Sequence, residues 1–257
     1  MKKLIATLLA LVLALGMFAC GNKNEAPGTT APKTEPTQTT APAEDTTAPE
    51  NTGVVEGAMT YAEYAAAELE TEVTVACYIQ ATQSWWDNRI SVYAAGKDGA
   101  YFIYELACSE EDSKKMVPGT LIKVEGVKGA WAGEVEIMDG TFEFVENAEK
   151  YVATPVDLTG KLASEELINY QNQLAAFKAM TVKEISYKNG EPGDDIYLTL
   201  TKDGKDYSFC VEVYLTGTDS DVYKTVGELK AGDVVDVEGF LYWYEGANPH
   251  ITAIELA

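Results

Sequence analysis

Basic and metal-binding side chains are scarce in this chain of 257 residues. It has one histidine, His250, and 19 Lys and Arg, of which Arg89 is the one arginine, against 41 Asp and Glu. Over residues 58–257 the balance is 15 Lys and Arg against 35 Asp and Glu, a net charge of −20. DNA and RNA binding depends on Lys and Arg that neutralise phosphates, so this composition predicts no nucleic-acid partner and no docking on anionic lipid.

Catalytic and metal-binding constellations are missing as well. A Ser-His-Asp or Cys-His arrangement must be built on His250, which we expect to be a surface or loop residue at the start of a strand. A zinc site needs more nitrogen or thiolate ligands than one histidine and scattered cysteines offer. Acidic pairs and acidic turns are too common in this composition to single out a glycosidase or a calcium site. We therefore expect no enzyme, no metal and no cofactor.

Cysteine is too rare for a disulfide framework. Cys77, Cys108 and Cys210 remain when Cys20 is set aside. Each lies among apolar or strand-forming residues, which favours small buried hydrophobic side chains. A Cys77–Cys108 bridge stays open as the alternative.

A long apolar run occurs only at the N-terminus. A basic start at residues 1–3 precedes an apolar stretch over 4–19, the pattern of a signal peptide at 1–19. Met17-Phe18-Ala19-Cys20 resembles the lipobox of bacterial lipoproteins, with Met17 in place of the usual Leu. The resemblance implies cleavage before Cys20, a lipid anchor on Cys20, and display on the outer face of the bacterial cell membrane, exposed to the envelope or the exterior. The alternative is an ordinary secretory signal followed by a chance cysteine.

Residues 20–57 have the composition of a tether that begins with the lipidated cysteine. Five of the nine prolines and nine threonines fall within 22–56, where Ala is the only apolar residue before Val54. Such a segment cannot bury enough apolar surface to offset its chain entropy. We therefore expect a disordered Thr/Pro-rich tether.

The remaining residues contain the same order of features twice. Each segment begins with a helix signal: a capping box at Thr60 and Glu63 with a helix to about Glu70 in the first, and a helix over about 164–174 in the second. An alternating apolar strand follows, from Val73 in the first segment and from Phe177 in the second. Two strands joined by a Lys-Asp-Gly turn, a short helical stretch and two more strands complete each segment. The turns are residues 97–99 and 202–204, and Val-Glu-Gly ends the fourth strand at 124–126 and at 237–239. The recurrence predicts two copies of one structural unit.

Five strands with a helix between the third and the fourth are the plan of the OB-fold, a small Greek-key barrel. These motifs, together with Pro118-Gly119, resemble the OB modules of bacterial envelope lipoproteins. The resemblance implies a mainly β chain with two five-stranded OB-like barrels in tandem, each preceded by a short helix. Module 1 would cover 58–147, a connection 148–163, and module 2 164–257. A β-sandwich would need more strands per repeat.

Aromatic residues gather in the predicted loops at the rim where OB-folds bind ligands. The rings offer stacking surfaces, and acidic neighbours such as Glu134 offer hydrogen bonds to sugar hydroxyls. The pattern predicts a non-catalytic binding module for a glycan or an extracellular protein. The alternatives are rings that cap the barrels or pack the two repeats together, and a structural or assembly role in an envelope complex. The candidate ligand-binding residues are Trp85, Trp86, Trp131, Tyr242, Trp243 and Tyr244.

Overall fold

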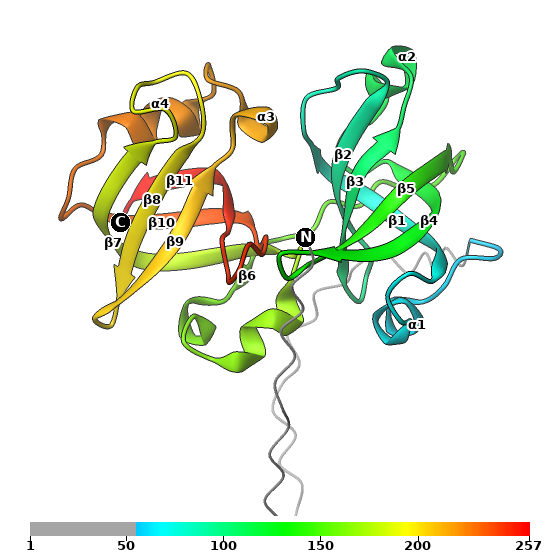
Figure 1. Cartoon of the computed structure of the whole chain (residues 1–257), viewed down its shortest axis with the longest axis horizontal. Coiled ribbons are helices and arrows are strands. Elements are labelled where there is room, and N and C mark those ends of the chain that lie inside the picture. The colour runs from blue at the N-terminus through cyan, green and yellow to red at the C-terminus, as the bar shows by residue number, and fades with distance from the viewer. Residues whose placement is uncertain (1–54) are drawn as a thin grey trace, which may run out of the picture. The chain divides into compact units, whose positions relative to one another are not determined.

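The computed structural model describes residues 55–257, which are mainly β (Figure 1). The predicted signal peptide, Cys20 and the predicted tether up to residue 54 lie outside the described residues. Within the described part, no helix has the length and apolar character needed to cross a bilayer.

The first module is a closed five-stranded barrel, as predicted. The strand order is β1-β2-β3-β5-β4, and β4 pairs back onto β1. The pairing of β3 with β5 is parallel and the others are antiparallel. A short helix α2 (Glu110–Ser113) connects β3 to β4, as in an OB-fold. The strands are β1 (Glu72–Thr82), β2 (Arg89–Ala95), β3 (Ala100–Ala107), β4 (Leu121–Trp131) and β5 (Glu134–Phe144).

A short helix, α1 (Tyr61–Ala66), precedes the first barrel. It begins with the predicted capping box, in which Thr60 Oγ1 accepts from the Glu63 amide at 3.2 Å and the Glu63 carboxylate accepts from the Thr60 amide at 2.8 Å. The helix ends earlier than the predicted residue 70. Its last carbonyls are satisfied instead by Nζ of the buried Lys128, which donates to the carbonyl oxygens of Tyr64, Ala65 and Ala67 at 2.9, 3.0 and 2.7 Å.

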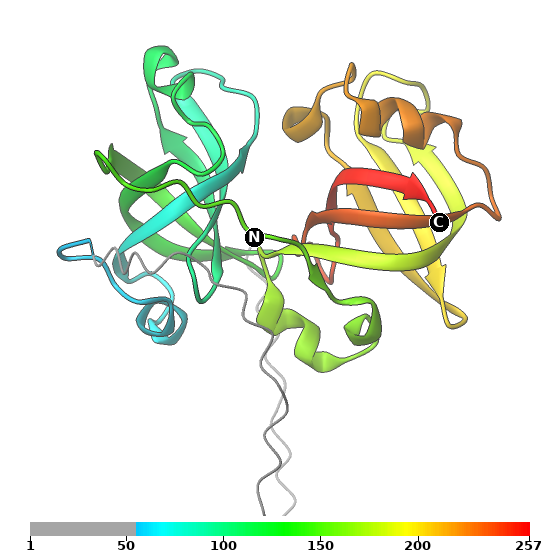
Figure 2. The ribbon, with the colours of Figure 1, turned by 180° about the vertical axis from the view of Figure 1, so that it is seen from behind.

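The second module repeats the strand order of the first. Its sheet runs β10-β11-β9-β8-β7-β6, and β7 also pairs with β10, so strands β7 to β11 close on themselves. Figure 2 shows β10 and β11 side by side from behind. Two helices, α3 (Val213–Thr216) and α4 (Asp221–Glu228), connect β9 to β10. The strands are β6 (Val156–Asp157), β7 (Leu174–Tyr187), β8 (Ile196–Lys202), β9 (Lys205–Val211), β10 (Val234–Phe240) and β11 (His250–Leu256).

The start of the second module differs from the predicted helix over 164–174. The chain forms two 3₁₀ helices, η1 (Thr159–Lys161) and η2 (Glu165–Tyr170), and β7 begins three residues before the expected Phe177. The Leu167 amide bonds to the Ser164 carbonyl at 3.1 Å, a three-residue spacing typical of short helical segments. β6, in the predicted connection, pairs in parallel with β7.

Each module has its own hydrophobic core, and a third, smaller cluster joins residues of both. The third cluster contains Tyr93 and Phe102 from the first barrel and Phe240 from β10. The rings of Tyr93 and Phe240 stack with centroids 4.3 Å apart and planes 10° apart. Cys77, Cys108 and Cys210 are free and buried, so the Cys77–Cys108 alternative is not realised.

His250 is buried, and the prediction of a surface or loop residue was wrong. Only 6% of it is exposed, because the ring stacks on Tyr242 at a centroid distance of 4.3 Å and faces the hydroxyl of Tyr93. Nδ1 of His250 lies 2.7 Å from that hydroxyl. A buried imidazole is stable when its ring nitrogen has a hydrogen-bond partner.

Candidate ligand-binding site

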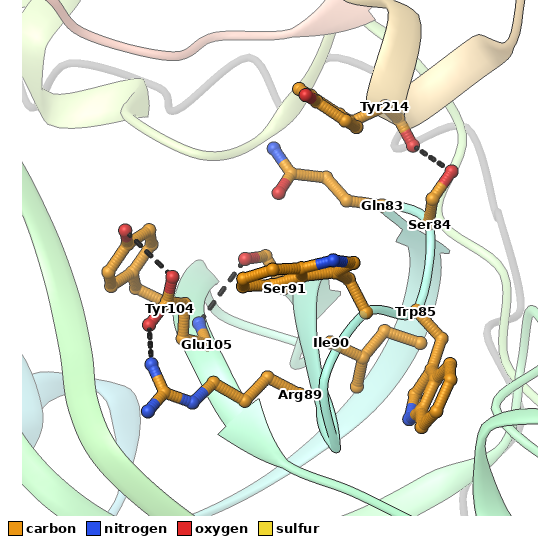
Figure 3. A pocket seen from close by; sticks show the side chains of 10 residues that line it. Gln83, Ser84, Trp85, Arg89, Ile90, Ser91, Tyr104, Glu105 and Tyr214 are labelled. Atoms are coloured by element: carbon orange, nitrogen blue, oxygen red, sulfur yellow. Dashed lines mark hydrogen bonds and ion pairs between the residues drawn. The ribbon is translucent and has the colours of Figure 1, made fainter. Parts of the chain in front are cut away.

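A cavity of about 440 Å³ opens on the side of the first module, where it meets α3 (Figure 3). Its wall is formed by the segment after β1, by β2 and β3, and by Tyr214 of α3. Strands two and three and the loop between strands one and two are the elements with which OB-folds bind ligands. The volume falls in the range of small-molecule sites.

A tight hairpin turn presents Trp86 at the cavity. The Trp86 amide donates to the Arg89 carbonyl at 3.0 Å, and the Arg89 amide donates back to Trp86 at 2.9 Å. The two residues between them, Asp87 and Asn88, have φ values of 46° and 60°. Asp and Asn tolerate this left-handed conformation, which a two-residue turn of this type requires. The turn leaves Trp86 70% exposed beside the cavity.

A bulge in β3 brings two consecutive residues to the same cavity. Neighbouring residues of a regular strand point to opposite faces, yet Tyr104 and Glu105 both line the wall. Glu105 has a φ of 45°, and its amide donates to Oγ of the buried Ser91 at 3.2 Å. The register between β2 and β3 shifts at this point. The irregular backbone therefore builds part of the site.

The charges at the mouth of the cavity neutralise one another. Arg89 forms an ion pair and a hydrogen bond with Glu105, and the Tyr104 hydroxyl donates to Glu105 Oε1 at 3.1 Å. Partial burial, followed by the hydrogen bond to Glu105, raises the pKa of Tyr104 above its usual value. The phenol is therefore neutral at physiological pH and can serve as a stacking surface.

The second module completes the wall through α3. The amide and Oγ of Ser84 both donate to the carbonyl oxygen of Tyr214, at 2.6 and 3.1 Å. Nε2 of Gln83 donates to the two carboxylate oxygens of Glu212, at 2.9 and 2.8 Å. Tyr214 is thereby held beside the loop that follows β1, with 59% of its surface exposed.

The arrangement is suited to a flat ligand. Exposed rings of Trp86, Tyr104 and Tyr214 surround one cavity, and hydroxyl, amide and ionic groups lie between them. Within residues 55–257, no three His, Cys, Asp or Glu side chains come together as metal ligands. The chemistry of the site is therefore stacking combined with hydrogen bonding at the edge of a ring.

The six candidate residues do not share one site. Trp85 and Trp86 lie at the cavity, where Trp85 Nε1 donates to the Cys108 carbonyl at 2.9 Å and its ring packs on the first core. The other four lie elsewhere. Trp131 ends β4 instead of lying in a loop, and its ring contacts Tyr244 at a centroid distance of 5.2 Å.

Tyr242 and Trp243 also contact other parts of the protein. Tyr242 stacks on His250, and Trp243 packs against the core of the second module. The Trp243 amide donates to Oε2 of Glu134 at 2.8 Å. Tyr242 also meets Phe102 of the first barrel at a centroid distance of 5.4 Å, a contact that corresponds to the alternative in which rings pack the repeats together. Glu134 is fully buried, so the expectation that it binds the hydroxyls of a ligand was wrong.

Two buried carboxyl groups lie on β5 near this junction. Burial raises the pKa of Glu134 to about 8 and that of Glu136 to about 7. Among the described residues, Glu134 Oε1 and Asn172 Oδ1 are buried without a hydrogen-bond partner. Asn172 Oδ1 is always an acceptor, whereas Glu134 Oε1 is an acceptor unless the carboxyl group carries a proton.

Sequence reasoning missed Arg89, Tyr104, Glu105 and Tyr214 as site residues. Arg89 had a usable signal, because it is the only arginine and starts the second strand after an aromatic pair. Tyr104 and Glu105 look like alternating strand residues, and the bulge that places both at the cavity has no clear sequence signature. Tyr214 belongs to the other repeat, about 120 residues from the rest of the site.

Comparison with known proteins finds solved structures of low similarity. No protein-family model matches the chain, and no curated protein matches it. A solved structure of a murine DNA-binding protein with double-stranded DNA is similar, with 10% identity, a TM-score of 0.35, and coverage of 72% of this chain and 96% of that one. The p202 HIN1 domain with a 12-mer of double-stranded DNA has 9% identity, a TM-score of 0.34, and coverage of 80% and 98%. A deletion mutant of the single-stranded DNA-binding protein from Thermus aquaticus has 12% identity, a TM-score of 0.25, and coverage of 72% and 93%.

These structures correct two predictions. The proteins named in them bind DNA, whereas the sequence had predicted a glycan or protein ligand and no nucleic-acid partner. Those predictions are withdrawn. With TM-scores of 0.25–0.35 and identities of 9–12%, these likenesses do not identify the ligand of this chain, which must be argued from the cavity.

Proposed function

We propose that the cavity binds an unpaired nucleobase, either in a nucleoside or in a short single strand of nucleic acid. The observation that supports this is the convergence of three exposed rings, from Trp86, Tyr104 and Tyr214, on one cavity. A base is a flat ring with donors and acceptors along its edge, and it stacks on such rings without regard to sequence. Arg89, Glu105 and Ser91 supply polar groups of both kinds at the cavity.

The charge of the protein restricts the form of this ligand. Residues 58–257 carry a net charge of −20, which repels a long polyanion. Stacking of one base does not depend on neutralising many phosphates. We therefore expect adenosine and very short oligonucleotides to bind better, per base, than long strands.

Titration calorimetry with adenosine, adenosine monophosphate and a four-residue single strand tests the proposal. Trp86→Ala and Tyr104→Ala should each weaken binding by about 1–3 kcal/mol, the usual contribution of one stacked base. Tyr197→Ala is the matched control, because Tyr197 on β8 is exposed to the same degree, 41% against 43% for Tyr104, and lies outside the cavity.

Two outcomes would contradict the proposal. Absence of heat and of tryptophan fluorescence change with all three probes at millimolar concentration would exclude a nucleobase ligand. Equal losses in Tyr104→Ala and Tyr197→Ala would show that the cavity is not where the base sits.

We further propose that this binding is non-catalytic and takes place outside the cell membrane. The lipobox-like sequence Met17-Phe18-Ala19-Cys20 supports a lipid anchor on Cys20 and display on the outer face of the membrane. The protein has one histidine, His250, and it is buried. Both facts support a binding role without catalysis.

A further inference from the structure

The wall that carries Tyr214 belongs to the second module, so the cavity is complete only while the two modules are docked. The contact at the cavity itself is small: Ser84 with the Tyr214 carbonyl, and Gln83 with Glu212. α3 has four residues, and the carboxylate of Glu212, the residue just before it, does not cap the helix. The carboxylate is instead used between the modules.

A series of polar contacts continues from the half-buried Glu212 away from the cavity. Oε2 of Glu212 lies 3.3 Å from Nδ1 of His250, and the same nitrogen lies 2.7 Å from the Tyr93 hydroxyl. Tyr93 comes from β2 of the first barrel and has no exposed surface. This series of contacts, Gln83–Glu212–His250–Tyr93, thus begins at the cavity in the first module, passes through the second, and returns to the first.

Stacked rings hold two members of this series, Tyr93 and His250. Tyr93 lies on Phe240 of β10, and His250 lies on Tyr242 with planes 25° apart. These contacts are desolvated, and a buried polar group left without its partner costs more free energy than an exposed one. The series of contacts therefore favours one docked arrangement of the two modules, the one that places Tyr214 at the cavity.

We propose that Tyr93, Glu212 and His250 are positioning residues for the ligand site, and that ligand binding and docking of the two modules are thermodynamically coupled through them. The inference rests on the proposed function, because it concerns the same cavity. Coupling of this kind is reciprocal: docking raises the affinity for the ligand, and the ligand stabilises docking by the same factor. None of the three residues lines the cavity.

The first test measures affinity for adenosine in the full chain. Tyr93→Phe keeps the ring stacked on Phe240 and removes only the hydroxyl that faces His250. We expect adenosine to bind at least about fivefold more weakly, the lower end of usual coupling between sites. Glu212→Gln removes the negative charge of the carboxylate that contacts both Gln83 and His250, and it should also weaken adenosine binding.

Tyr223→Phe is the matched control. The hydroxyl of this buried tyrosine accepts from the Gly193 amide at 2.9 Å and donates to the Asp194 carbonyl at 2.8 Å, both within the second module. Its loss should lower stability without changing the affinity for adenosine. Equal weakening by Tyr93→Phe and Tyr223→Phe would reduce the effect to general destabilisation and overturn the coupling.

A second readout does not need the ligand. Hydrogen exchange of the Ser84 amide, which donates to Tyr214 across the two modules, should be faster in Tyr93→Phe and should be slowed by adenosine in the wild type. Faster exchange with unchanged affinity would overturn the coupling while the proposed function stands. No binding of adenosine to the wild type would overturn the proposed function, and the coupling with it.

Discussion

Oε2 of Glu134 accepts a hydrogen bond of 2.8 Å from the backbone amide of Trp243, which joins the start of β5 to the segment between β10 and β11. The other carboxyl oxygen of Glu134 and the Oδ1 atom of Asn172 are buried acceptors for which the described residues provide no donor. Burial raises the pKa of Glu134 to about 8. The folded protein therefore holds Glu134 as a neutral acid at physiological pH.

Glu134→Gln should stabilise the protein at pH 7 and above. In the unfolded chain Glu134 ionises near the ordinary glutamate pKa of 4.5, whereas in the folded protein it keeps its proton until about pH 8. Unfolding thus releases a proton between these values, and the free energy of unfolding falls by up to about 1.4 kcal/mol per pH unit, an effect that is complete above pH 8. Glutamine does not ionise, so its burial carries no such pH-dependent cost.

Urea unfolding between pH 5 and 9 measures this effect. The slope of stability against pH should be smaller in Glu134→Gln than in the wild type. The control is Glu143→Gln, on the same strand but 70% exposed at its side chain, which should follow the wild type. A variant with the wild-type slope would mean that Glu134 is ionised in the folded state.

Lys128→Met should destabilise the first module. Nζ of Lys128 donates to three carbonyl oxygens at the end of α1, and methionine has no donor to replace it. Leaving these groups without a partner costs about 1–3 kcal/mol. Lys114→Met, at a lysine side chain that is 70% exposed, should change stability much less. Similar losses for both variants in urea unfolding would contradict a capping role.

The two modules should fold separately but less stably. The fragment 58–150 keeps the whole first core, and 161–257 keeps the second core except for Leu158, yet they expose Tyr93 and Phe240, which are buried together in the full chain. We expect cooperative unfolding of each fragment at a lower urea concentration than for 58–257. If circular dichroism shows both fragments unfolded, the division into modules is wrong and the two barrels are a single folding unit.

Cys20→Ala should release the protein from the membrane. The sequence around Cys20 resembles a lipobox, and the variant lacks the thiol to which lipid is attached. Fractionation of cells should find the wild type with the membrane and the variant in the medium. Membrane retention of the variant, together with a wild-type Cys20 that carries no lipid in mass spectrometry, would refute the anchor.

Local sequence signals predicted the strands and turns of the fold. Asp203 and Gly204 are the two residues of the turn between β8 and β9, with φ values of 50° and 74°, as the Lys-Asp-Gly motif indicates. Val73, Val75, Cys77 and Ile79 alternate along β1, and all four point into the first core. Such features depend on neighbouring residues, so they can be found without the fold. The repetition of their order was enough to indicate OB-like barrels.

The candidate site was predicted only in part, because it depends on contacts over long distances in the sequence. Trp85 and Trp86 lie at the cavity, but Trp131 and Tyr244 contact each other at the junction of the modules. All four are tryptophan or tyrosine residues near turns, and nothing in the local sequence separates the two groups.

The sequence by itself determined the order of strands, the turn chemistry and the acidic character of the chain, since each follows from local residue types and their spacing. Only the tertiary structure decided which aromatic rings line the cavity and which contact one another at the junction of the modules. It placed Tyr214 of one repeat beside Trp86 of the other, and it buried His250 against Tyr93. These outcomes depend on the docking of two barrels, in which contacts such as Gln83–Glu212 and Tyr93–His250 join residues more than 100 positions apart and leave no periodic signal in the sequence.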